Sequence, residues 1–295
     1  MLDVPGLGHI MHTKDWFADE RVAAGAAGSA LPILYHGGPV LQPGTKVAAI
    51  YWSLTRIYAN GPAVGTFGPG SADGSLVGFF LSHLGGSPYF NINSTYTNGA
   101  GQHIVNSVTY TQYWANVVGA PTGTQSVSNA QMVNMLQTGF TSGALKYDPS
   151  TLYAIFTSGK VNLGGGFGTQ YCAYHTRGTV IVNGQARTVL FAAMPYDFAY
   201  PSACTSGFAP ANGAVDPGAD YEVNTLAHET EETTTDEFGN AWFDAQGFEN
   251  ADKCAWTWGT TYTTPAHGVA NMLIGGKNFL VQRNWLETGG CALSH

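Results

Sequence analysis

Acidic residues are concentrated in one segment of the chain, and this segment constrains the fold more than any other. Residues 216–252 contain 11 of the 19 aspartates and glutamates, and the same window has no lysine or arginine. Like charges this close together repel one another unless something compensates them. A bound cation is the most economical compensation. The alternative that stays open is an acidic face exposed to solvent.

The stretch AHETEETTTDEFGNAW (227–242) within this window has the pattern of a metal-binding helix. Its small and apolar residues recur at helical spacing, which predicts a helix over 222–235 with one buried face. On that helix His228 and Glu232 lie one above the other. The HExxH zinc hydrolases use this arrangement, here with glutamate in place of the second histidine, and zinc accepts either side chain. We expect His228 and Glu232 to bind Zn²⁺ and Glu229 to be the general base on the zinc-bound water.

A third zinc ligand should follow the helix. Glu249 and Asp252 lie 17 and 20 residues after Glu232, and their spacing of three places them on one face of a helical turn. That distance resembles the spacing in zinc peptidases whose third ligand is a glutamate. We expect one of the two to bind the metal and the other to orient His228 through its second ring nitrogen.

Calcium is the main alternative for this acidic segment. Calcium prefers six to eight oxygen ligands and no histidine. Asp236 and Asp244, with backbone carbonyls, could form such a site on the loop after the helix. His228 argues for at least one transition-metal position, although a lone helical histidine is more often a hydrogen-bonded core residue.

A second histidine, His175 in YCAYHTR (171–177), is a candidate for the same site. It could act in catalysis as a hydrogen-bond donor to the transition state, or bind the metal. The alternative is a structural histidine beside a disulfide, held by backbone hydrogen bonds.

The four cysteines predict two disulfides, because their number is even and no CxxC metal pair is present. Three pairings are possible. We favour the pairing nearest in order, Cys172–Cys204 and Cys254–Cys291, over four free buried thiols.

Composition places the chain among secreted proteins and excludes several classes. Charged residues are only 10%, lysine is scarce, and glycine, aromatic and uncharged polar residues are abundant. No basic cluster indicates nucleic-acid binding, and no apolar run approaches the length of a membrane span. We expect a secreted, monomeric protein whose signal peptide is missing from this sequence.

The secondary-structure pattern predicts an α/β (α+β) fold, with a central mixed sheet flanked by helices and a zincin-like active-site helix. We expect residues 1–30 to be a loosely held N-terminal arm and 31–295 a single catalytic or binding domain. The expected helices are 75–86, 128–140 and 222–235. The expected strands are 31–41, 46–54, 103–110, 152–157, 178–182 and 188–196.

Several short motifs resemble the phosphate-induced protein 1 family, known in plants as the EXORDIUM group, and its microbial members in particular. They are YHGGPVL (35–41), YCAYH (171–175), the acidic run above, ENADKCAW (249–256) and a cysteine near the C-terminus. The likeness extends over most of residues 31–293. It implies an extracellular, cell-wall-associated protein, and Cys172, Cys254 and Cys291 match cysteine positions of the plant proteins.

The function expected from these observations is a secreted zinc-dependent hydrolase, most simply a metallopeptidase, acting on a peptide or a cell-wall polymer. Two alternatives stay open. One is a non-enzymatic wall- or carbohydrate-binding protein with a structural metal. The other is a glycosidase with a carboxylate pair, Glu229 with Glu249 or Glu232 with Asp252.

Overall fold

A mixed seven-stranded sheet organises the computed structural model, which describes residues 9–23 and 31–295. Strands β10, β7, β3 and β5 run parallel to one another, whereas β1 pairs antiparallel with β9, β9 with β10, and β4 with β5. The order across the sheet is β1 (His9–His12), β9 (Tyr171–Val182), β10 (Gln185–Met194), β7 (Thr151–Phe156), β3 (Thr45–Tyr51), β5 (Val108–Trp114) and β4 (Phe67–Pro69).

Five α-helices and several short elements complete the described part of the chain. The helices are α1 (Lys14–Ala23), α2 (Leu76–Leu84), α3 (Asn129–Ser142), α4 (Pro201–Cys204) and α5 (Pro217–Thr235), with 3-10 turns η2 (Gly70–Ala72), η3 (Phe90–Thr95), η4 (Asp197–Ala199) and η5 (Asp252–Cys254). The short strands are β2 (Leu34–Tyr35), β6 (Ser126–Val127), β8 (Asn162–Leu163), β11 (Trp242–Phe243), β12 (Tyr262–Thr263), β13 (Val269–Ala270), β14 (Met272–Ile274), β15 (Lys277–Phe279), β16 (Asn284–Trp285) and β17 (Cys291–Ala292).

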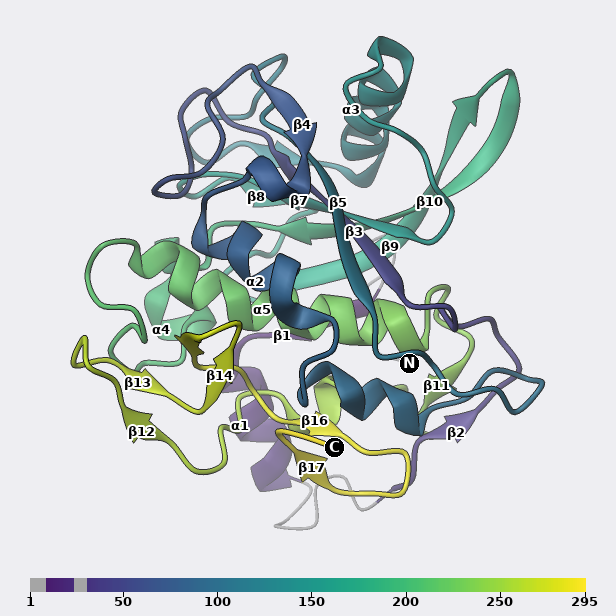
Figure 1. Ribbon diagram of the computed structural model, residues 1–295, viewed down its shortest axis with the longest axis vertical. Helices are drawn as coiled ribbons and strands as arrows, with labels where there is room; N and C mark the ends of the chain where they lie inside the picture. Colours follow the sequence, from purple (N-terminus) through teal and green to yellow (C-terminus); the bar gives the residue numbers. More distant parts are fainter. Residues whose placement is uncertain (1–8, 24–30) are drawn as a thin grey trace.

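The two faces of the sheet carry separate hydrophobic cores, because successive strand residues point to opposite sides. On one face Ala48 and Ile50 pack with the α3 residues Met132 and Leu136. On the other face Val47, Ala49 and their neighbours pack with α2 and α5. Figure 1 shows α3 on one side of the sheet and α2 and α5 on the other. The predicted fold class, a single domain with a central mixed sheet and flanking helices, is confirmed.

Most predicted elements are present with shifted ends. Ser128 caps α3 and forms a reciprocal capping box with Gln131. The strand predicted over 31–41 is wrong, because only Leu34 and Tyr35 pair, and a Gly-Gly-Pro sequence follows at 37–39. The strand predicted over 103–110 begins at Val108 and continues to Trp114.

The predicted N-terminal arm needs correction. Residues 9–12 form β1, the edge strand of the central sheet, and residues 14–23 form α1. Strand β1 pairs with β9 over its whole length, and His9 is opposite His175. Residues 9–23 are therefore part of the folded domain and not a loosely held arm. The rest of the predicted arm, positions 1–8 and 24–30, lies outside the described residues.

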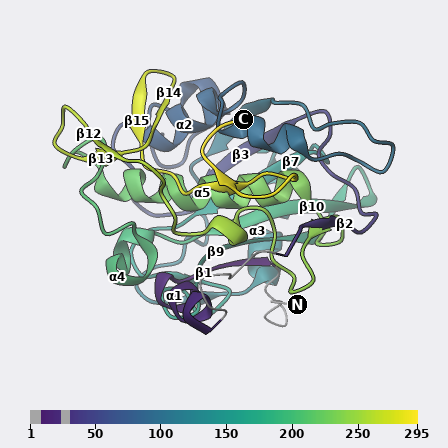
Figure 2. The same ribbon diagram turned by 90° about the horizontal axis from the view of Figure 1, so that it is seen from below.

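Helix α5 is buried on all sides, not on one face as predicted. From Glu222 to Thr235 every residue is fully or almost fully buried. The sheet covers one side of the helix, and the C-terminal segments run along another (Figure 2). There the backbone N–H of Gln282 donates to Asn224 Oδ1, and the side-chain amide of Asn284 donates to Glu231 Oε2. The helix begins at Pro217 because Asp216 caps its N-terminus. Burial on this scale excludes the solvent-exposed acidic face.

Both predicted disulfides are present. Cys172 pairs with Cys204 and Cys254 with Cys291, closing sequence separations of 32 and 37 residues. Among residues 9–23 and 31–295, none of the helices is long and apolar enough to cross a lipid bilayer.

Candidate metal centre

Helix α5 supplies the centre of a buried cluster of histidines and carboxylates. His228, Glu229 and Glu232 come from its C-terminal half, and Glu249 and Asp252 come from the following loop. His175 comes from β9, where it lies two residues after Ala173 and so shares the face that packs on α5. The structure thus brings together all six catalytic and zinc-site residues predicted from the sequence.

The first potential ligand group is His228, Glu232 and Asp252. Their ligand atoms lie within 4.8 Å of one another. His228 Nε2 lies 2.9 Å from Glu232 Oε1 and 3.5 Å from Asp252 Oδ1. The backbone N–H of Asp252 also donates to Glu232 Oε1, at 3.0 Å, which fixes the loop against the helix. These three side chains could hold a metal ion.

A second potential ligand group is His175, Glu229 and Glu232, also within 4.8 Å of one another. His175 Nδ1 lies 3.1 Å from Glu229 Oε2 and 3.7 Å from Glu232 Oε2. Glu232 therefore belongs to both groups, through a different carboxylate oxygen in each.

Burial shapes the charge states of this cluster. Burial lowers the pKa of His175 well below its ordinary value, so this imidazole is neutral. Burial also lowers the pKa of His228, but the Glu232 and Asp252 carboxylates outweigh it and raise that pKa well above its ordinary value. Burial raises the pKa of Glu229 and brings that of Glu232 to about 7. In the metal-free protein, protons partly offset the carboxylate charge that a cation would otherwise balance.

Several buried polar atoms of the cluster have no well-oriented hydrogen-bond partner. They are His175 Nε2, His228 Nε2, Glu229 Oε1, Glu232 Oε2, Asp252 Oδ1 and both carboxylate oxygens of Glu249. An unsatisfied buried polar group costs about 1–3 kcal/mol. Ring nitrogens and carboxylate oxygens that converge in this way are the ligand atoms that a zinc ion accepts. The donor set therefore fits a metal.

The residue that orients His228 was not predicted. Gln282 Nε2 lies 3.0 Å from His228 Nδ1 and donates to the Ala251 carbonyl at 2.8 Å. Neither Glu249 nor Asp252 contacts Nδ1, so the prediction that one of them orients His228 is wrong in its choice of residue. Gln282 is 54 residues from His228 in the sequence, and no local sequence pattern indicates that the two side chains meet.

Glu249 lies at the outer end of the cluster and is paired with His9. Its Oε2 lies 2.8 Å from His9 Nδ1 and 3.8 Å from His175 Nε2. The Glu249 carboxylate raises the pKa of His9 to about 10, so His9 is a cation. The His9 and His175 rings stack with centroids 5.2 Å apart. His9 was not predicted as part of the site, since it lies in the segment expected to be an arm, and the HIMH sequence at 9–12 carries no alternating pattern that marks a strand.

The two residues proposed for calcium do not form a common site. Asp244 Oδ2 pairs with Lys253 Nζ at 2.8 Å, and its Oδ1 accepts backbone N–H groups from Gln246 and Phe248. Asp236 Oδ1 accepts the backbone N–H groups of Asn240 and Ala241. Asp244 therefore braces a loop and is already neutralised by a lysine, which removes it as a calcium ligand.

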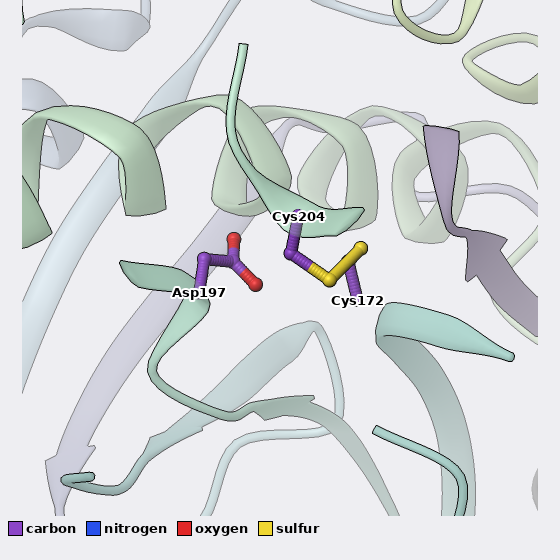
Figure 3. Close-up of side chains that lie close together, drawn as sticks. All are labelled: Cys172, Asp197 and Cys204. Atoms are coloured by element: carbon purple, nitrogen blue, oxygen red, sulfur yellow. A yellow bond between two sulfur atoms is a disulfide. The ribbon is translucent and has the colours of Figure 1, made fainter. Parts of the chain in front are cut away.

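A third convergence of potential ligands, Cys172, Asp197 and Cys204, is not a metal centre in the folded chain. Figure 3 shows the Asp197 carboxylate beside the Cys172–Cys204 disulfide. Sulfur atoms joined in a disulfide are not thiolates and do not bind metal as ligands.

The comparisons with known proteins add no relative to this description. No protein-family model, no curated protein and no solved structure matches the chain.

Proposed function

We propose that this protein is a secreted, metal-dependent hydrolase whose ion is held by His228, Glu232 and Asp252. The observation that carries the proposal is the convergence of one imidazole and two carboxylates, fully or almost fully buried, with unpartnered atoms directed at one another. Zinc is the ion of choice, because it binds both nitrogen and carboxylate oxygen at about 2.0–2.2 Å. Such an ion polarises a substrate carbonyl and lowers the pKa of a water molecule.

Glu229 is the chain's own candidate for proton transfer. It follows His228 on the helix, and its Oε1 has no hydrogen-bond partner. Burial raises the pKa of Glu229 above its ordinary range, which brings a carboxylate closer to the neutral pH at which a general base works best. His175, 3.1 Å away, holds the other oxygen of Glu229 and orients it.

Two further features support the rest of the proposal. Two disulfides are typical of proteins exported to an oxidising compartment. The motif likeness to the phosphate-induced protein 1 family favours a cell-wall setting, with a peptide or a wall polymer as the substrate.

A structural metal is the second candidate, and one observation favours it. His228, Glu229 and Glu232 have 0% exposed surface, so no substrate atom reaches them in this conformation. His9, whose side chain is 26% exposed, is the cluster's contact with solvent. A hydrolase would need the elements that cover the cluster to move apart, whereas a structural ion would not.

Glu229→Gln separates the two candidates. The wild type and the variant would be loaded with Zn²⁺ and assayed on casein, on a peptide library and on wall polysaccharides, with metal content measured in parallel. The hydrolase proposal expects turnover by the wild type and a loss of at least about 100-fold in the variant. A zinc-loaded wild type without turnover on any substrate would favour the structural ion. A wild type that binds no metal would contradict both.

A further inference from the structure

The buried cluster contains two potential ligand groups that share Glu232. We infer that Glu232 bridges two divalent metal ions, one held with His228 and Asp252 and the other with His175 and Glu229. The first of these is the ion of the proposed function, on which this inference rests. The second position changes the role of Glu229 from a free base to a ligand.

The orientation of the Glu232 carboxylate is the first argument. Its Oε1 lies 2.9 Å from His228 Nε2, and its Oε2 lies 3.7 Å from His175 Nδ1. The two oxygens therefore face two different histidines that come from different elements, α5 and β9. A carboxylate with one oxygen in each group is the usual way to hold two ions close together, and paired ions in hydrolytic sites lie about 3.5–4 Å apart.

The dimensions of both groups match metal coordination. Ligands at about 2.0–2.2 Å from a tetrahedral ion lie about 3.3–3.6 Å from one another. The distances from His228 Nε2 to its two carboxylates are 2.9 and 3.5 Å. The distances from His175 Nδ1 to its two carboxylates are 3.1 and 3.7 Å. These four histidine–carboxylate distances lie within a few tenths of an ångström of the tetrahedral range, and all ligand atoms of each group lie within 4.8 Å of one another.

A single ion in the first group leaves the second group without compensation. Glu232 Oε2 and Glu229 Oε1 are both buried and lack hydrogen-bond partners. Within the described residues, the ion pairs of Glu229 and Glu232 are with histidines alone, and a histidine that binds metal is neutral. With an ion in the first group only, Glu229 Oε1 stays buried without a hydrogen-bond partner, which costs free energy. A second ion removes that cost.

Manganese provides a direct probe of a bridged pair. The full-length protein would be stripped of metal, reloaded with Mn²⁺, freed of excess metal by gel filtration and examined by elemental analysis and electron paramagnetic resonance. We expect two Mn²⁺ per chain and an exchange-coupled spectrum, because a shared carboxylate couples the two spins. His175→Leu and Glu229→Gln should each bind one Mn²⁺ and show the six-line spectrum of an isolated ion.

Glu222→Gln is the matched control, since Glu222 is also a buried glutamate of α5 but lies outside both groups. It should retain two coupled ions. If His175→Leu fails to fold by circular dichroism, the nearly isosteric Glu229→Gln decides the question.

The outcomes separate this inference from the proposed function. One Mn²⁺ per wild-type chain, unchanged in Glu229→Gln, overturns the second position and leaves the first intact. Two ions without exchange coupling overturn the Glu232 bridge. No bound ion in the wild type overturns both the inference and the metal-dependent hydrolase.

Discussion

Helix α5 buries two groups of carboxylates, and they are built differently. In its C-terminal half Glu229 and Glu232 face the histidines His175 and His228. In its N-terminal half Glu222 lies close to Asp197, whose backbone N–H donates to Glu222 Oε2 at 3.2 Å. Thr225 donates its hydroxyl to Asp197 Oδ2 at 2.6 Å, and no histidine is among the groups that set either pKa.

The difference shows two ways to bury acidic side chains. Burial raises the pKa of Asp197 well above its ordinary value and that of Glu222 to about 8, so a retained proton lowers the charge of this pair at neutral pH. In the other group, imidazole nitrogens converge with carboxylate oxygens in the arrangement that binds transition metals. One group is thus suited to keep a proton and the other to exchange protons for a cation.

Metal removal should give the largest change in stability, and it should act only through the carboxylates that face histidines, Glu229 and Glu232. An ion present at a thousand times its dissociation constant adds about 4 kcal/mol to the free energy of unfolding. We expect a chelator to lower the melting temperature of the zinc-loaded protein by roughly 6–7 °C. Differential scanning calorimetry would measure it. Glu232→Gln should melt at the same temperature with and without chelator, and a chelator effect that persists there would place the ion elsewhere.

The Asp197–Glu222 pair should make stability depend on pH in the opposite sense to an ordinary carboxylate. The pKa of Glu222 is raised from 4.5 to about 8 in the folded state, so its contribution is complete below pH 4.5 and is lost as pH rises through about 8. Replacing it in Glu222→Gln removes the ionisation. Between pH 5 and 9 the wild type should lose about 2–4 kcal/mol relative to the variant.

Urea unfolding of the metal-free proteins at several pH values would measure this difference. If the free energies of unfolding of the two proteins changed with pH in parallel, Glu222 would already be ionised in the folded state. The N-terminal half of α5 would then not differ from the C-terminal half in the way described above.

Gln282 should tune the metal group without belonging to it. In Gln282→Leu, His228 loses the side-chain amide that lies against Nδ1; with a metal on Nε2 the ring proton is on Nδ1, so the amide oxygen of Gln282 has to accept it. Loss of such a partner lowers metal affinity about 10–100-fold. Competition with a chromophoric zinc chelator would measure the affinity, and the number of ions per chain should not change. Gln185→Leu on the exposed β9–β10 hairpin is the control, and equal losses in both variants would contradict an orienting role.

His9 should have the smallest effect, because it is partly exposed. The Glu249 carboxylate raises its pKa to about 10, so its stabilising contribution is complete below pH 6.5 and is lost as pH rises through about 10. We expect His9→Gln to lower the free energy of unfolding of the metal-free protein by about 1–3 kcal/mol at pH 6. The difference from wild type should vanish above pH 10. His36→Gln, at an exposed histidine, should change stability little at any pH.

Local patterns predicted more of this molecule than long-range ones. The spacing of His228, Glu229 and Glu232 in one helix follows from the 3.6-residue period, and the structure has that helix. The disulfide pairing nearest in order, which was favoured among three possible ones, is the observed pairing. The concentration of acidic residues in this segment indicated that their charge must be compensated. In the structure, histidines pair with Glu229 and Glu232, and burial raises the pKa values of both carboxyl groups.

Other features were beyond local patterns. Gln282 reaches His228 across 54 residues, and His175 reaches Glu229 across 54 residues. His9 reaches Glu249 only because β1 joins the sheet edge beside β9. Sequence spacing gives no information on these contacts, because they depend on the order of the strands.

The sequence by itself determined the helix and its His-Glu pattern, because each depends on residues close together in the chain, and it favoured the observed disulfide pairing among three possible ones. The tertiary structure alone decided that the helix is buried on all sides, that Glu222 pairs with Asp197 instead of joining the histidines, and that Glu232 faces two of them. The physical reason is that burial and ligand convergence depend on which strands and loops pack around α5, and that packing is a property of the whole chain.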